Sequence, residues 1–223
     1  MLARSDLVIA NCEPVAQSMQ ELAPVVHVVP NGLELRDGVA RPPRPKELRR
    51  IPRPIIGYVG NLSQRIDVRL LKRVVRSRPD WQFVFVGSAH HDQSVLDLGY
   101  RRNVHFVGVK RYEQTLAFVE HFDVAIVPHL DNEMTRSMNP LKAYVYCSTG
   151  VPVVSTPVAN LDELAGLVTV ADGPDAFVAA IGDALRRGRR PPDRARLAPH
   201  SWEARVARVM ELVDDVAGSG QAH

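Results

Sequence analysis

The sequence predicts an α/β fold, a doubly wound parallel sheet of about six strands that follows a short βαβ unit. Short runs of apolar and β-branched residues alternate with longer amphipathic segments over residues 55–218. This alternation is typical of a parallel sheet with helices on both faces. The chain has 223 residues, of which 45% are hydrophobic, so it can bury the core of one large domain.

The first 34 residues have the pattern of a small βαβ unit. Strands are predicted over 6–11 and 25–32, with a short helix over 13–23 between them. Residues 35–54 are rich in proline and arginine and have no apolar period, which is typical of a linker. We therefore expect a separate unit, a linker, and a main domain over 55–218.

The main domain reads as regular strand–helix alternation. Strands are predicted over 55–60, 82–88, 104–108, 124–129, 151–156 and 167–171. Helices are predicted over 67–78, 113–122, 139–149, 174–188 and 201–218, with a shorter one over 161–166 and an ambiguous segment over 90–100. Crossovers between parallel strands are right-handed, which limits the topology to a few arrangements.

The helix predicted over 139–149 is the most informative element. Asn139 is a good N-cap and Pro140 suits the first helical position. A helix start offers free N–H groups and the positive dipole end to an anion such as phosphate. Lys142 lies in this first turn, where a cation opposes the dipole, so stability alone does not explain it. The alternative is a helix that only packs on the sheet.

Ligands bind doubly wound sheets at the carboxyl ends of the strands, so the loops that follow the strands should carry function. Gly60 permits a close approach of the backbone, and the Arg65 guanidinium could fork onto a diphosphate or pair with a carboxylate. His129 ends a strand there and could contact a donor or be structural. Glu133, in the polar loop 129–138, could contact sugar hydroxyls or be solvated.

Several activities and partners are excluded or disfavoured. No G-K-[ST] and no G-x-S-x-G occurs, and the histidines show no metal-ligand spacing. The two cysteines are isolated, which favours a reduced, cytoplasmic setting. Arginines crowd two segments, 36–53 and 186–196, which either contact an anionic membrane peripherally or are simply solvated. No aromatic residues interleave with them, so we expect no nucleic-acid partner.

Four runs follow one another in chain order: VHVVPNG, IIGYVGNLSQRIDVRLL, DVAIVPHLDNEMTRSMNPLKAY and GVPVVST. With RPDWQFVFVGS, NVHFVG and SWEARV they resemble the donor-binding half of two-Rossmann (GT-B) glycosyltransferases, in the large retaining bacterial family of group 1 type. The resemblance covers nearly the whole chain. It implies hexosyl transfer from a nucleoside-diphosphate sugar to a polysaccharide or lipid-linked acceptor. It also implies that the reaction needs no metal or other cofactor, and that it takes place in the cytoplasm or at the cytoplasmic face of the membrane.

The resemblance also implies donor-binding positions. Gly60 matches the family's glycine beside the diphosphate, and Arg65 falls near, though not on, the place of a phosphate-binding lysine. Gly108 matches a glycine whose following loop touches the nucleobase. The sequence NPLK at 139–142 matches an N-P-x-K form of the helix start on the phosphate side.

Two departures from the family pattern leave the function open. Ser137 and Val145 stand where the family usually has two glutamates, and Asn61 replaces an arginine; valine cannot accept a hydrogen bond from ribose. Residues 1–34 resemble only the tail of the family's acceptor domain, so a separate acceptor-domain chain is an expected partner. The chain is therefore either a donor-binding glycosyltransferase domain or a catalytically inactive relative acting as partner or scaffold.

Overall fold

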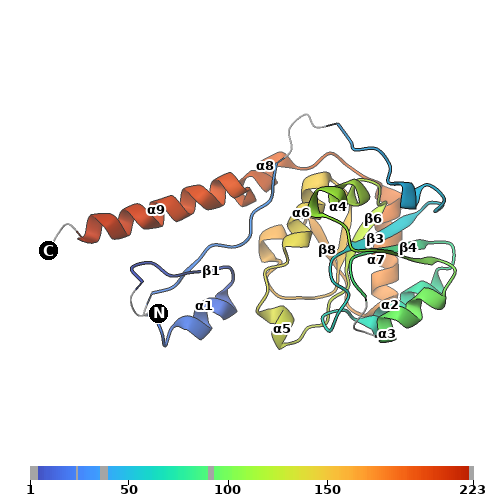
Figure 1. Cartoon of the computed structure of the whole chain (residues 1–223), viewed down its shortest axis with the longest axis horizontal. Helices are drawn as coiled ribbons and strands as arrows, with labels where there is room; N and C mark the ends of the chain where they lie inside the picture. Colours follow the sequence, from blue (N-terminus) through green and yellow to red (C-terminus); the bar gives the residue numbers. More distant parts are fainter. Residues whose placement is uncertain (1–4, 24, 36–39, 90–92, 221–223) are drawn as a thin grey trace.

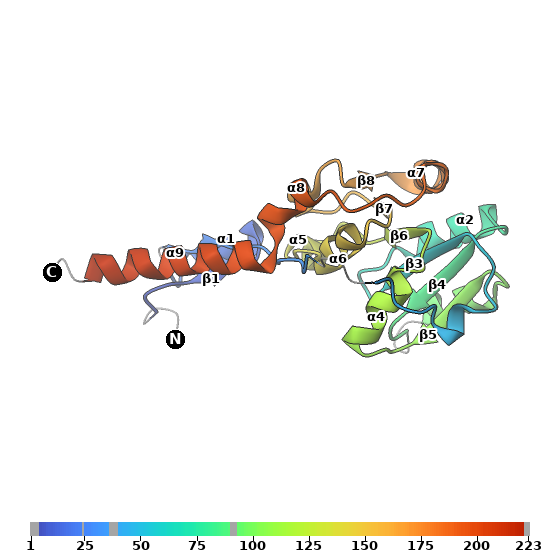
Figure 2. The ribbon, with the colours of Figure 1, turned by 90° about the horizontal axis from the view of Figure 1, so that it is seen from above.

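The computed structural model describes residues 5–23, 25–35, 40–89 and 93–220. Its centre is a parallel sheet in the order β5-β4-β3-β6-β7-β8 (Figure 1 and Figure 2). The strands are β3 (Ile55–Val59), β4 (Gln82–Val86), β5 (Val104–Gly108), β6 (Val124–Val127), β7 (Val153–Ser155) and β8 (Val168–Val170). The predicted fold class, a doubly wound parallel sheet of six strands, is therefore confirmed.

Helices cover both faces of this sheet, because successive side chains of each strand point to opposite sides. Tyr58 and Phe83 pack with one set of helices, whereas Ile55 and Val84 pack with the other. The first face carries α2 (Val68–Ser77), α3 (Gln93–Leu96), η3 (Asp97–Tyr100) and α7 (Gly173–Arg187). The second carries α4 (Tyr112–Val119), α6 (Leu141–Thr149), η4 (Asp162–Leu164) and α8 (Arg194–Leu197).

The N-terminal unit and the last helix lie together, away from the sheet (Figure 1 and Figure 2). The unit consists of β1 (Ile9–Ala10), α1 (Glu13–Met19) and β2 (His27–Val28), and the last helix is α9 (Trp202–Gly220), preceded by η5 (Ala198–His200). The parallel pairing of β1 with β2 confirms the predicted βαβ pattern, although each strand has only two residues. Two backbone hydrogen bonds of Leu33, with His200 and Trp202, join the segment after β2 to the start of α9.

The proline- and arginine-rich segment is anchored to the sheet domain. It contains the short helix η2 (Lys46–Leu48), and the side chains of Leu48 and Ile51 are buried in the core of the second face. The Arg44 guanidinium donates to the carbonyl oxygens of Leu48 and Ile51, each at 2.9 Å. Over its described part, this segment is therefore held to the sheet domain by apolar contacts that its proline- and arginine-rich composition does not predict.

Among the helices that the structure describes, none is both long enough and apolar enough to cross a lipid bilayer.

Candidate functional site

The candidate site lies where the winding of the sheet reverses. The chain passes from β3 outward to β4 and β5 on one side, and β6 then returns to the other side of β3. Ligands of doubly wound sheets bind at this switch point, beyond the carboxyl ends of the strands. Here the loops after β3 and β6 are joined: the Leu130 N–H donates to Arg65 O at 2.8 Å, and the Asp67 N–H donates to Pro128 O at 2.8 Å.

Three glycines form a low rim at the ends of β3, β4 and β5. Gly60, Gly87 and Gly108 have φ values of 142°, 147° and 78°, a region that disfavours side chains. The Gly87 N–H donates to Gly108 O at 3.0 Å, and a Cβ on Gly87 would lie 1.9 Å from Gly60 O. A Cβ on Gly108 would meet nothing within 4 Å, so the strand end beside it is open. The sequence predicts Gly60 and Gly108 here, and the rim connects them through Gly87.

A compact cluster of polar side chains adjoins Gly60. Lys142 Nζ lies 3.5 Å from His129 Nε2 and 5.2 Å from the centre of the Tyr58 ring. The Tyr58 hydroxyl lies 3.4 Å from the same His129 nitrogen and donates to Asn61 O at 3.2 Å. A Cβ on Gly60 would be 3.2 Å from Lys142 Cε. The fold thus brings together four of the predicted residues with Tyr58, a tyrosine within the first strand that sequence reasoning missed.

Burial and like charges control protonation in this cluster. The side chain of His129 is 3% exposed, and burial, with the charges of Lys142 and Arg65, lowers its pKa to about 3. Burial and the charge of Arg65 lower the pKa of Lys142 to about 8. His129 is therefore neutral at pH 7, and its Nε2 can accept a hydrogen bond from either the Lys142 ammonium or the Tyr58 hydroxyl.

The cluster has cations but no anion to balance them. In the described part of the chain, neither Arg65 nor Lys142 lies within ion-pair distance of a carboxylate. The Arg65 Nε is buried and has no hydrogen-bond partner. Buried polar groups are rarely unsatisfied, and two neighbouring cations repel each other. An anion bound between Arg65 and Lys142 would remove both penalties, so the arrangement can bind a phosphate or diphosphate group.

The start of α6 differs from the sequence prediction. The helix begins at Leu141 with Pro140 as its N-cap, and Asn139 makes no capping hydrogen bond. Instead, Asn139 Oδ1 accepts from the Asn31 N–H at 3.0 Å, which ties the N-terminal unit to this helix. The Leu141 and Ala143 N–H groups donate to backbone carbonyl oxygens at 2.9 Å. The prediction of an Asn139 cap was wrong because Asn31 is the competing partner, and Lys142 is the part of this helix that reaches the cluster.

The polar loop before α6 also contains a feature that periodicity misses. A short helix, α5 (Glu133–Arg136), forms there because the Asn132 side chain caps it by accepting from the Thr135 N–H at 3.0 Å. Glu133 begins this helix and Ser137 follows it, and both are exposed. No hydrogen bond found in the described residues joins either of them to the cluster around Lys142.

Much of the two arginine-rich segments serves the fold itself. Arg189 donates to Glu120 Oε2 at 2.6 Å and to Glu120 O at 2.7 Å, and Arg53 forms an ion pair with Asp123. Arg36, in the first of these segments, and His90 and His91, in the loop after β4, lie outside the described residues. Within the described residues there is no group of three or more His, Cys, Asp or Glu side chains that could hold a metal ion.

A sheet with this strand order and a rim of glycines at its switch point defines a Rossmann-like, doubly wound protein. A family model described as glycosyl transferases group 1 matches residues 53–187. The chain belongs to this glycosyltransferase family.

Relatives with known names agree with this assignment. The chain is 26% identical over 143 residues to TuaH of Bacillus subtilis (strain 168), whose name places it as a glycosyltransferase in teichuronic acid biosynthesis; the match covers 62% of this chain and 36% of TuaH. A glycosyltransferase structure from Rickettsia africae is similar with a TM-score of 0.73 at 13% identity, covering 95% of this chain and 63% of that one. Anabaena HepE, solved with UDP and glucose, is similar with a TM-score of 0.62 at 16% identity. The match covers 98% of this chain and 64% of HepE. The chain thus spans about a third of its curated relative and under two thirds of these structures.

Proposed function

We propose that this chain is the donor-binding unit of a glycosyltransferase that uses a nucleoside-diphosphate sugar. The observation that carries the proposal is the pair of unbalanced cations, Arg65 and Lys142, beside the glycine rim at the switch point, whose Gly108 end is open. Two basic side chains and an accessible backbone are what a diphosphate leaving group needs for stabilisation as its charge develops. Two similar structures, HepE and the pneumococcal O-GlcNAc transferase GtfA, were solved in complex with UDP, which supports a nucleotide as the anion.

The proposed arrangement assigns a role to each neighbouring residue. The diphosphate lies against Gly60 and Asn61, between Arg65 and Lys142, and the nucleobase extends along the rim toward Gly108. His129 is neutral, so it orients the Lys142 ammonium and faces the sugar side. Glu133 and Ser137 are solvent-exposed and can reach the donor only through a movement of the polar loop.

The finer chemistry belongs to the same proposal. We propose retaining transfer of a hexosyl group without a cofactor, to a polysaccharide or lipid-linked acceptor, in a cytoplasmic or inner-membrane setting. The name of TuaH supports a polysaccharide product. Transfer needs donor and acceptor held in one cleft. The proposed partner is therefore an acceptor-binding domain, located either on the same polypeptide or on a separate one. We also propose the division that the sequence predicts: an acceptor-domain remnant over 1–34, a linker over 35–54 and a donor-binding domain over 55–218.

Calorimetric titration with UDP, GDP and dTDP tests the donor proposal directly. We expect one of the three nucleotides to bind with one site per chain, and inorganic phosphate alone to bind much more weakly. If the folded protein releases or takes up no heat with any of them, and equilibrium dialysis also detects no binding, the proposal is refuted.

One observation favours a second candidate, a catalytically inactive partner or scaffold. Val145, a half-buried residue of α6, stands where the family pattern usually places a ribose-binding glutamate. Substituting Val145→Glu separates the two functions. If the wild type binds no nucleotide and the variant does, the site has lost its ligand, and this outcome supports the scaffold. Binding by the wild type that the variant weakens indicates a working, rebuilt site.

A further inference from the structure

The exposed side of α2 is a continuous stripe of positive charge. Arg69, Lys72, Arg73 and Arg76 are spaced i, i+3, i+4 and i+7, so they share one face, opposite the buried leucines and valines of the same helix. The helix contains no acidic residue in its ten positions. Like charges at these spacings destabilise a helix, so the stripe lowers the stability of α2. The two arginine-rich segments for which the sequence leaves membrane contact or solvation open, 36–53 and 186–196, do not include this helix.

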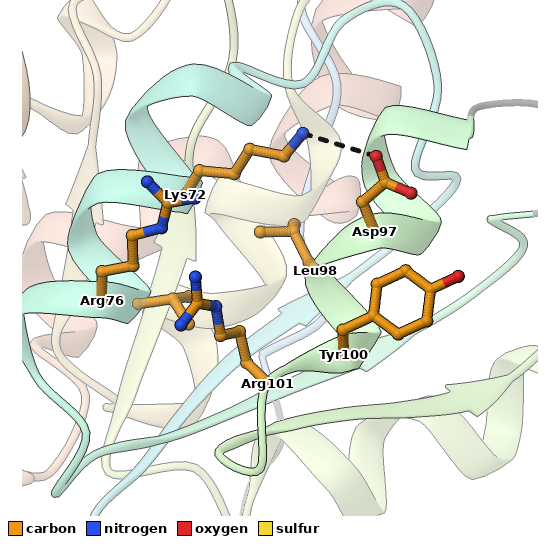
Figure 3. A pocket seen from close by; sticks show the side chains of 7 residues that line it. Lys72, Arg76, Asp97, Leu98, Tyr100 and Arg101 are labelled. Atoms are coloured by element: carbon orange, nitrogen blue, oxygen red, sulfur yellow. Dashed lines mark ion pairs between the residues drawn. The ribbon is translucent and has the colours of Figure 1, made fainter.

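A second element adds charge and an aromatic ring to the stripe. Arg101, just after η3, extends toward α2, and together with Lys72 and Arg76 it surrounds a cavity of about 470 Å³ (Figure 3). The floor of the cavity is apolar, formed by Val75 and Leu98. Tyr100 stands on the opposite side and is 84% exposed.

Acidic side chains compensate only part of this charge. Asp97 lies 3.8 Å from Lys72, and both side chains are more than a third exposed, so the pair is weak. In the part of the chain that the structure describes, Arg73, Arg76 and Arg101 form no ion pair within 4.0 Å. The face therefore presents excess positive charge to its surroundings.

We propose that this face of α2 and η3 lies on an anionic phospholipid surface. The geometry favours a lipid surface over a dissolved polyanion because charge, an apolar floor and an exposed tyrosine occur together, and tyrosine settles at the headgroup level of a bilayer. The cavity between Lys72, Arg76 and Arg101 accepts a lipid phosphate. The stripe begins four residues after Arg65, so a domain resting on α2 holds its switch-point edge close to the membrane.

Vesicle co-sedimentation of the full chain tests this proposal without using any nucleotide. We expect binding to vesicles of phosphatidylcholine with 30% phosphatidylglycerol and no binding to phosphatidylcholine alone. Each basic residue at a membrane surface contributes about fivefold to the partition coefficient, so Arg73→Gln/Arg76→Gln should lower it about 25-fold. Glutamine is a good helix former, and circular dichroism checks that the variant remains folded.

The matched control removes the same charge from one of the other arginine-rich segments. Arg186→Gln/Arg187→Gln, at the end of α7, should leave the partition coefficient within about twofold. Equal losses in both double variants would show that only net charge matters and would overturn the proposal. Absence of binding to the anionic vesicles, or binding to heparin or duplex DNA but not to vesicles, would overturn it as well.

Discussion

Substituting Lys142→Met tests whether the basic cluster is built for a ligand rather than for stability. Methionine keeps the length and apolar stem of the side chain and removes the ammonium that lies 3.5 Å from His129. With a pKa of about 8, Lys142 is about 80% protonated at pH 7.4 in the free protein. An anion that binds beside it completes that protonation and gains a charge-assisted hydrogen bond.

The two consequences of the substitution have opposite signs. A hydrogen bond between charged groups contributes roughly 1.5–3 kcal/mol, so the dissociation constant of the nucleoside diphosphate should rise about 10- to 150-fold. The stability of the free protein should increase instead. The pKa of Lys142 is lowered from 10.5 to about 8, which corresponds to a cost on the order of 3 kcal/mol as an upper limit. This cost is present in full below pH 8 and disappears as the pH rises toward 10.5.

Calorimetry measures the affinity and urea denaturation at pH 7.4 measures the free energy of unfolding. The exposed lysine of η2, substituted as Lys46→Met, is the control and should change neither quantity appreciably. A variant that loses stability while binding nucleotide as tightly as the wild type would contradict the reasoning, because Lys142 would then be a structural residue.

Three further predictions follow from the same geometry. Nucleotide binding raises the pKa of Lys142 above its free value of about 8, so affinity should fall as the pH rises above 8. Calorimetry at pH 8.5 in buffers of different ionisation enthalpy should then show uptake of up to about one proton, and identical heats in all buffers would exclude this coupling. The pKa of His129 is lowered to about 3, so the unfolded chain takes up a proton first and stability falls as the pH drops from 6.5. His129→Gln should remove this decline, about 1.4 kcal/mol per pH unit, and an unchanged urea profile between pH 6.5 and 4.5 would contradict the assigned protonation. Gly87→Ala places a Cβ 1.9 Å from Gly60 O at a φ of 147°, so it should lower the free energy of unfolding by at least about 2 kcal/mol. The control is Gly182→Ala in α7, where the new Cβ meets nothing nearer than 3.6 Å. It should instead raise the free energy of unfolding by up to about 1 kcal/mol.

The fold could be predicted because its signals are local and repeated. Each buried strand, such as IIGYV at β3 or VAIV at β6, is a short apolar run, and each helix, such as α2, alternates with it. The same local reasoning fails where a distant segment competes. Asn139 looks like a helix cap in sequence, yet Asn31, 108 positions earlier, takes its side chain. Leu48 lies in a segment with a linker's composition and is nevertheless fully buried.

The candidate site could be predicted in part, because the switch-point rule selects the right loops. It indicates Gly60, Arg65 and His129 before any coordinates are known. It cannot indicate Tyr58, because a tyrosine inside an apolar strand looks like core until its hydroxyl is placed 3.4 Å from His129. Nor can it show that Arg65 has an unsatisfied nitrogen, since that depends on every neighbour in three dimensions.

Ion pairing separates two arginines that serve the fold from the cations of the two proposed sites. Arg189 and Arg53 belong to the densest arginine runs of the sequence, and each is paired with a carboxylate in the structure. Lys142, Arg65, Arg73 and Arg76 are less conspicuous in sequence, and within the described residues none of them forms an ion pair. A fold gains nothing from placing like charges together without anions. Unbalanced charge, and not the density of charge along the chain, is therefore the property from which ligand binding at the switch point and lipid contact at α2 are inferred.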